Sequence, residues 1–180
     1  MMIVSNTTPL IGLASIGQFD LLRQLFGEIY IAQAVYDEAV VVGREVGGAK
    51  REVSAATWIK HVEVKDRLAV EVLLDEIDLG EAETIVLARE LGADWVLMDE
   101  KKGRRKLTEM GLPKIGTVGI LLKAKQVGLL TVIRPDWNSC INMGSVSAKQ
   151  SLMRCYAKQM NNHSSHLKGW GALMEFDHAI

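Results

Sequence analysis

The sequence predicts an α/β domain in which a central parallel sheet carries helices on both faces. Two observations predict this class. Short apolar runs typical of buried strands alternate with helical segments throughout residues 2–128, an order that favours parallel strands joined by right-handed crossovers. The run at 94–98 (DWVLM) is almost wholly apolar, as expected for a strand that is covered on both faces.

The composition is that of an ordinary globular domain. The 180 residues are 48% hydrophobic and 24% charged, with a net charge of −1; this argues against bulk electrostatic binding of nucleic acid but leaves room for a local basic patch. No segment has the roughly 18 uncharged apolar residues of a membrane span, and the N-terminus does not resemble a signal peptide. Cys140 and Cys155 form no disulfide framework and match no zinc pattern. We therefore expect a cytoplasmic protein.

The first half of the chain alternates strands and helices. The first strand is expected at 2–5. Thr8 is a plausible N-cap for a helix over 10–16, because Pro9 follows it at the first helical position. The other elements expected before residue 78 are a helix at 20–26, a strand at 28–31, a helix at 33–42 that carries Glu38, a loop at 43–48, a helix at 49–56, a strand at 58–64 and an amphipathic helix at 66–77.

The stretch 79–106 (LGEAETIVLARELGADWVLMDEKKGRRK) organises the second half. Apolar residues recur at helical spacing over 81–91, and Gly92 is a natural residue to end that helix. The strand at 94–98 then ends in Asp99, and open α/β sheets bind their ligands at the carboxyl ends of such strands. A charged helix up to residue 110, a strand at 113–116 and a helix at 117–126 complete the pattern.

Four polar side chains stand at positions where they could converge. Asn6 and Asp99 both end predicted strands, and parallel neighbours would place them at the same edge of the sheet. Glu81 lies in the first turn of a helix, although Asp78-x-x-Glu81 also has the form of a capping box. Glu38 interrupts an otherwise apolar helix and could equally face solvent. If they converge, three carboxylates and an amide make an oxygen-ligand site, which suits Mg²⁺ or Mn²⁺.

Four segments of the chain, in this order, resemble PIN-domain nucleases, and in particular a PIN-like branch related to VapC-type toxins. The segments are IVSNTTPLIGLASIGQFDLL, YIAQAVYDEAV, DLGEAETIVLARELGADWVLMDEKKGRR and GLPKIGTVGILLKAKQVGLL. The resemblance implies a PIN-like fold over residues 1–135, with an acidic pocket for one or two divalent ions. It assigns the catalytic and metal-binding positions to Asn6, Glu38, Glu81 and Asp99, with Thr7 and Thr8 beside the first of them.

The resemblance also implies an activity and partners. It implies a metal-dependent ribonuclease that uses Mg²⁺ or Mn²⁺ to hydrolyse RNA phosphodiester bonds, acts as the toxin of a toxin–antitoxin pair, binds a protein antitoxin and forms a homodimer. Exposed cations close to the pocket would hold the RNA backbone together with Thr7 and Thr8. The aromatic content of 6% argues against extensive base stacking. The expected cations are Lys101, Lys102, Arg104 and Arg105.

Two other functions remain open at this point. Asn6 departs from the acid that PIN nucleases usually carry there, which favours a catalytically weak or inactive module that binds nucleic acid or a partner. A phosphate-binding α/β protein, such as a receiver-like domain, would need a lysine at a later strand end and lacks the four-segment match. Glu83 is a further acid near Glu81. Residues 136–180 differ in composition from the rest, and we expect an atypical C-terminal tail that is partly helical or poorly ordered.

Overall fold

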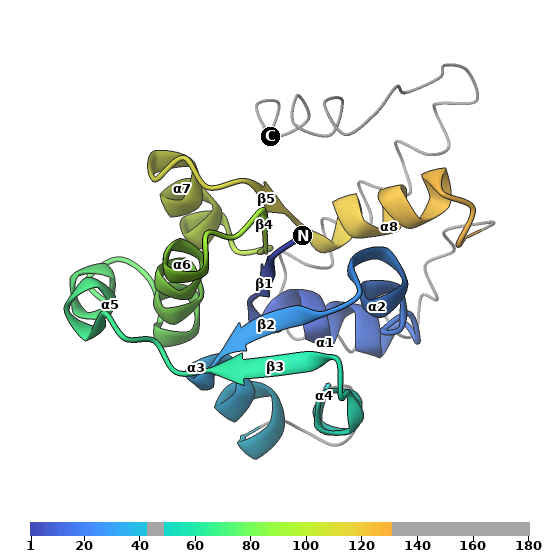
Figure 1. Ribbon diagram of the computed structural model, residues 1–180, viewed down its shortest axis with the longest axis horizontal. Coiled ribbons are helices and arrows are strands. Elements are labelled where there is room, and N and C mark those ends of the chain that lie inside the picture. Colours follow the sequence, from blue (N-terminus) through green and yellow to red (C-terminus); the bar gives the residue numbers. More distant parts are fainter. Residues whose placement is uncertain (43–48, 131–180) are drawn as a thin grey trace.

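The fold is seen in a computed structural model that describes residues 1–42 and 49–130. The expected loop at 43–48 and the expected tail at 136–180 lie outside the described residues. Five parallel strands form one sheet in the order β3-β2-β1-β4-β5 (Figure 1). The predicted α/β class with a parallel sheet is therefore confirmed. The strands are β1 (Ile3–Ser5), β2 (Ile29–Ala32), β3 (Ile59–Val62), β4 (Trp95–Leu97) and β5 (Lys114–Ile115).

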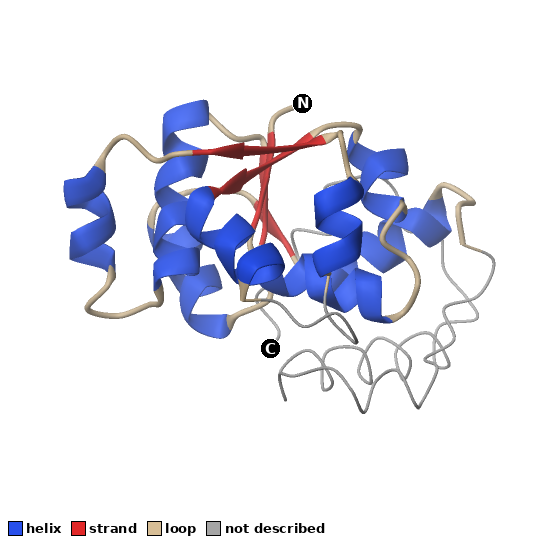
Figure 2. Ribbon diagram, turned by 90° about the horizontal axis from the view of Figure 1, so that it is seen from below, coloured by secondary structure: helices blue, strands red, loops and turns tan. Residues whose placement is uncertain are grey.

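Helices cover both faces of the sheet, as predicted (Figure 2). On one side α6 packs against α5 and α7, and on the other side α8 packs against α1 and α2 (Figure 1). The helices are α1 (Thr7–Ser15), α2 (Leu21–Phe26), α3 (Gln33–Tyr36), α4 (Lys50–Ala55), α5 (Arg67–Leu73), α6 (Leu79–Leu91), α7 (Lys101–Glu109) and α8 (Thr117–Gln126). No helix of the described residues is long and apolar enough to cross a membrane.

The strand order places a switch point between β1 and β4. The chain runs outward from β1 through β2 to β3 on one side, and then returns to place β4 on the other side of β1. At this switch point Val4 of β1 lies between Tyr30 and Val96 of its two neighbours. Connections that leave in opposite directions open a crevice at the carboxyl ends of the two strands, which is where such sheets bind ligands.

Most expected boundaries agree with the structure to within two residues, and three expected helices differ further. The first helix begins at Thr7, so Asn6 rather than Thr8 stands at the N-cap position. Pro9 is then the third residue of the helix. N–H groups of the first turn have no acceptor within a helix, so a proline, which has no N–H, is tolerated there. The helix expected at 33–42 continues from α3 into a π turn, η1 (Asp37–Val41). The helix expected to reach residue 77 ends at Leu73.

Candidate metal and nucleic-acid site

Asn6 joins the two strands that flank the switch point. Its backbone N–H donates to the carbonyl of Leu97 over 2.9 Å, and its side chain is only 4% exposed. The side-chain Nδ2 donates to Oε2 of Glu100 over 3.3 Å and contacts the sulfur of Met98 at 3.3 Å. These two acceptors fix the orientation of the amide, and Oδ1 is left buried without a hydrogen-bond partner.

Glu81 has a second unpartnered oxygen. The predicted capping box is present, because Glu81 N donates to Asp78 Oδ1 over 2.8 Å and Asp78 N donates to Glu81 Oε2 over 3.3 Å. The cap uses only Oε2, and Oε1 is buried without a partner in a side chain that is 3% exposed. Burial, and then the charge of Asp78, raise the pKa of Glu81, although the backbone N–H groups of Asp78 and Gly103 act against this. Glu81 can therefore cap α6 through Oε2 and still offer Oε1 to a ligand.

Two glycines allow side-chain oxygens of the site to approach the helix backbone closely, because neither glycine has a Cβ. A Cβ added at Gly80 would lie 3.3 Å from Glu38 Oε2 and 3.5 Å from Asn6 Oδ1. A Cβ added at Gly103 would lie 3.0 Å from Glu81 Oε1. The oxygens of Asn6 and Glu38 thus lie together against Gly80, whereas the carboxylate of Glu81 lies against Gly103.

Glu38 reaches this place from the π turn η1. Glu38 is exposed, which was one of the two positions expected for it, the other being the site. Its Oε2 nevertheless accepts a hydrogen bond of 2.6 Å from the hydroxyl of Thr7. Thr7 is buried in the first turn of α1. Its hydroxyl therefore donates to a carboxylate of η1 and links the start of α1 to that turn. π turns occur often at functional sites.

The two acids that follow β4 make different contacts. Oδ1 and Oδ2 of Asp99 accept hydrogen bonds from the backbone N–H and the hydroxyl of Thr117, over 2.8 and 2.5 Å. Glu100 instead accepts hydrogen bonds from the Thr8 hydroxyl and from Asn6 Nδ2. Burial raises the pKa of both carboxyls above its ordinary value. Glu100 was not among the site residues predicted from the sequence, although it directly follows Asp99 at the end of the same strand.

Glu83 is occupied elsewhere. Its Oε2 accepts a hydrogen bond of 2.9 Å from the N–H of Ala34, near the start of α3, and its Oε1 forms a 2.5 Å ion pair with Arg67. The side chain of Glu83 is only 5% exposed. It therefore ties α6 to α3 and α5, and it is not among the acids that surround Asn6 and Gly80.

The basic run at the start of α7 divides into two groups. Lys101 and Lys102 are exposed. Arg104 is only partly exposed and donates to the carbonyl of Met98 over 2.9 Å, so the expectation that it is exposed was wrong. Arg105 pairs with Glu76 over 2.8 Å and with another acid of its own helix. Lys101 and Lys102 are thus the better placed cations for an RNA backbone.

A groove of about 580 Å³ brings basic and acidic side chains together. Its lining includes Lys101 and Lys102 as well as Glu81 and Glu100. The remaining lining residues come from the segment that joins α5 to α6, which are Leu74, Asp75, Glu76, Ile77 and Asp78. Acids and lysines in one groove suit a divalent ion together with a phosphate backbone.

The donor set fits a hard divalent cation through its unpartnered oxygens. Mg²⁺ and Mn²⁺ take carboxylate and amide oxygens, and Asn6 Oδ1 and Glu81 Oε1 are buried without partners. Within residues 1–42 and 49–130, no three Asp, Glu, His or Cys side chains are grouped so as to hold an ion by themselves. Asn6 Oδ1 and Glu81 Oε1 are thus the candidate ligands that the structure leaves without a partner.

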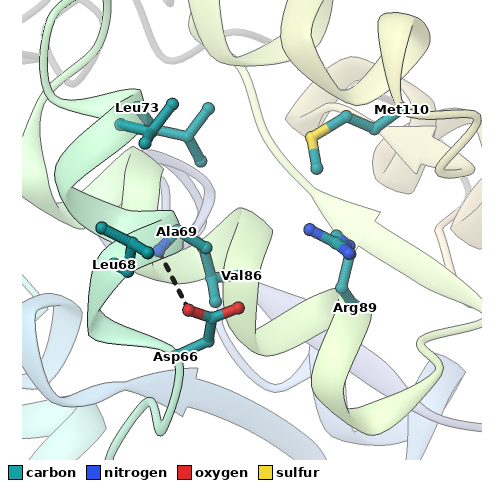
Figure 3. Close-up of a pocket in the computed structure, with 8 residues that line it drawn as sticks. Asp66, Leu68, Ala69, Leu73, Val86, Arg89 and Met110 are labelled. Atoms are coloured by element: carbon teal, nitrogen blue, oxygen red, sulfur yellow. Dashed lines mark hydrogen bonds between the residues drawn. The ribbon is translucent and has the colours of Figure 1, made fainter.

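A second hollow, of about 320 Å³, lies between α5 and α6 (Figure 3). Its lining is mainly apolar, and Asp66 at its edge caps α5 by accepting a 3.0 Å hydrogen bond from Ala69 N. Its single carboxylate is thus already used in a helix cap, and the hollow offers no cluster of oxygen ligands. The other lining residues are Leu68, Val72, Leu73, Val86, Arg89 and Met110.

Comparison with known proteins adds one finding. A family model described as a PIN domain matches residues 2–160, which is most of the chain. No curated protein matches the chain.

Proposed function

Because the chain belongs to the PIN-domain family, whose fold is that of nucleases, we propose that it is a divalent-metal-dependent ribonuclease that hydrolyses RNA phosphodiester bonds. The observation that carries the proposal is the pair of buried, unpartnered oxygens on Asn6 and Glu81. Leaving such atoms unsatisfied costs free energy. Cation binding is one way for such an oxygen to gain a partner.

The residues of the chain divide the work. Asn6, Glu38, Glu81 and an acid from the end of β4 would hold Mg²⁺ or Mn²⁺ once the ion draws their side chains together, because no three acids of residues 1–42 and 49–130 are grouped closely enough in its absence. Thr7 and Thr8 orient two of the carboxylates through their hydroxyls. When bound, the metal lowers the pKa of a coordinated water and stabilises the charge that develops on the phosphate oxygens. Lys101 and Lys102 would hold the RNA backbone along the groove.

Cleavage of a mixed RNA pool by the full chain tests the proposal. We expect cleavage with Mg²⁺ or Mn²⁺ and none with excess EDTA. Lys123→Gln, which removes one charge from α8, is the control variant. It should cleave RNA like wild type if the activity does not depend on surface charge in general. If the chain binds RNA without metal-dependent cleavage, the nuclease proposal is wrong. The second candidate function, a catalytically inactive RNA-binding module, is then correct, and the uncharged Asn6 is the observation that favours it.

Charge reversal at Lys101 and Lys102 is expected to weaken RNA binding by about tenfold or more at low salt. It should also flatten the dependence of affinity on salt, because each phosphate contact with single-stranded RNA contributes about 0.7 to that slope. Fluorescence anisotropy with a labelled RNA at several salt concentrations measures both. Arg105→Gln is the control, since Arg105 is already paired with Glu76. Equal losses in the two variants would contradict a role specific to the groove.

We also propose that the protein is the toxin of a toxin–antitoxin pair, that an antitoxin covers its acidic pocket, and that it forms a homodimer. The segments 10–16 and 20–26 are rich in leucine and isoleucine, which makes them candidates for an apolar dimer surface. Most of their leucines are buried in the core of the chain itself, namely Leu10, Leu13, Leu21 and Leu22. Exposed apolar side chains lie instead on α5, at Leu68 and Val72, and a dimer surface is better sought there.

A further inference from the structure

We propose that Glu100, rather than Asp99, is the carboxylate that the end of β4 contributes to the metal site, and that Asp99 is a positioning residue for α8. This inference rests on the proposed nuclease function and names a ligand of the same site. It reverses the assignment that the sequence resemblance implies, in which Asp99 takes the role.

Backbone direction separates the two neighbouring acids. Glu100 has φ −66° and ψ 130°, an extended conformation at the N-cap position of α7. The hydrogen bonds show that Asp99 reaches the start of α8, whereas Glu100 reaches the start of α1.

Glu100 shares its surroundings with the unpartnered oxygens. One of its oxygens accepts from Thr8 and the other from Asn6, whose own Oδ1 has no partner. Glu100 also lines the groove that contains Glu81. Two carboxylates in one groove repel each other unless a cation lies near them. The arrangement therefore points to Glu100 as a ligand.

Asp99 already has a structural role. Thr117 is the first residue of α8, and its N–H would otherwise lack an acceptor within the helix. Asp99 accepts this N–H and the Thr117 hydroxyl, so it caps the helix from another segment of the chain. A Cβ at Gly116 would lie 2.7 Å from Asp99 Oδ1, which shows how closely the carboxylate approaches the backbone.

The test measures Mn²⁺ affinity of the full, metal-free chain by isothermal titration calorimetry, together with its melting temperature. Glu100→Gln should raise the Kd for Mn²⁺ by about tenfold or more, and Glu100→Asp should restore part of the affinity. Glu109→Gln, an exposed change at the far end of α7, is the matched control and should bind Mn²⁺ like wild type. Asp99→Asn should lower the melting temperature and change the Kd less than Glu100→Gln does.

The outcomes separate this inference from the function on which it rests. If wild type neither binds Mn²⁺ nor cleaves RNA, the proposed function is wrong. If wild type does both, and Glu100→Gln binds Mn²⁺ as wild type does while Asp99→Asn loses the affinity, Glu100 is not the ligand. Should Glu100→Gln fail to fold, Thr8→Val removes the hydroxyl that orients Glu100 and should itself raise the Kd by about threefold. An unchanged Kd in that variant would overturn the assignment.

Discussion

Replacing Glu81 by glutamine is expected to stabilise the metal-free protein while it removes most of the cleavage activity. Glutamine at this position still suits the capping box, so α6 keeps its start. The change removes a buried carboxylate whose charged form is disfavoured by burial, as its raised pKa indicates. Cleavage should fall by roughly 100-fold or more, because even groups that only orient metal ligands contribute about 10- to 100-fold.

The stabilisation should depend on pH in a defined direction. Because the pKa of Glu81 is raised above 4.5 in the folded state, the folded chain binds more protons than the unfolded chain between these two values. Wild-type stability therefore falls as pH rises through this window. The gain in melting temperature of Glu81→Gln, measured in EDTA, should be absent below about pH 4.5 and largest above the raised pKa. The pH effects of unchanged groups cancel in this difference.

Glu83→Gln is the matched comparison, since it changes a second buried glutamate of α6, two residues away. Glu83 is compensated by Arg67 and by Ala34 N, so its substitution should lower the melting temperature. Opposite signs for the two variants would confirm that only Glu81 is buried at a net cost. If Glu81→Gln also lowers the melting temperature in EDTA at pH 8, the oxygen at Oε1 is not the unsatisfied atom that the structure places there.

Replacing Asn6 by aspartate is expected to lower the Mg²⁺ concentration for half-maximal cleavage by about tenfold. The variant adds a full negative charge where wild type offers an amide oxygen, and unit charges about 4 Å apart interact by about 4 kcal/mol at an effective dielectric of about 20. Repulsion from Glu100, which loses its amide donor, offsets much of this gain. The metal-free variant should therefore be less stable, by about 1–3 kcal/mol, and should gain more stability than wild type when metal is added.

Gln24→Glu controls for the Asn6 experiment. Gln24 is also an amide that donates to a carboxylate, over 2.6 Å to Asp20, but it lies exposed on α2. The measurements are metal titrations of cleavage rate and of melting temperature. Gln24→Glu should leave the response of both quantities to metal at the wild-type values. If Asn6→Asp leaves both responses unchanged, Asn6 does not contact the metal and the proposed pocket is wrong.

The sequence was sufficient for the fold because its apolar runs are short and well separated by helix-ending glycines. The alternation of strands and helices predicted a parallel sheet, and the capping box at Asp78 and Glu81 could be read directly. These features depend on residues that are close in sequence, where local physical chemistry decides the outcome. The pairing of β1 with β4, which places Asn6 beside the acids that follow β4, joins distant segments and was only assumed before the structure showed it.

What sequence reasoning missed depends on direction and on distant partners. Nothing within the Asp99-Glu100 pair says which carboxylate turns toward Thr117 and which toward Thr8, because both partners come from remote segments. The partly buried state of Arg104 likewise depends on a carbonyl at Met98. The π turn at Asp37–Val41 has no composition that distinguishes it from an α-helix.

The central position of β1 has a consequence for how the protein is made. The hydrogen bonds that join Asn6 and Thr8 to Glu100 span 94 and 92 residues. Contacts between such distant segments form only after the entropy of closing the intervening chain has been overcome. Synthesis begins at the N-terminus, so Asn6, Thr7, Thr8 and Glu38 leave the ribosome well before Glu100. A nascent chain that ends before β4 lacks Glu100, Lys101 and Lys102 of the groove. The proposed nuclease activity would thus be among the last properties that the chain acquires during translation, and an interrupted message would yield a fragment without it.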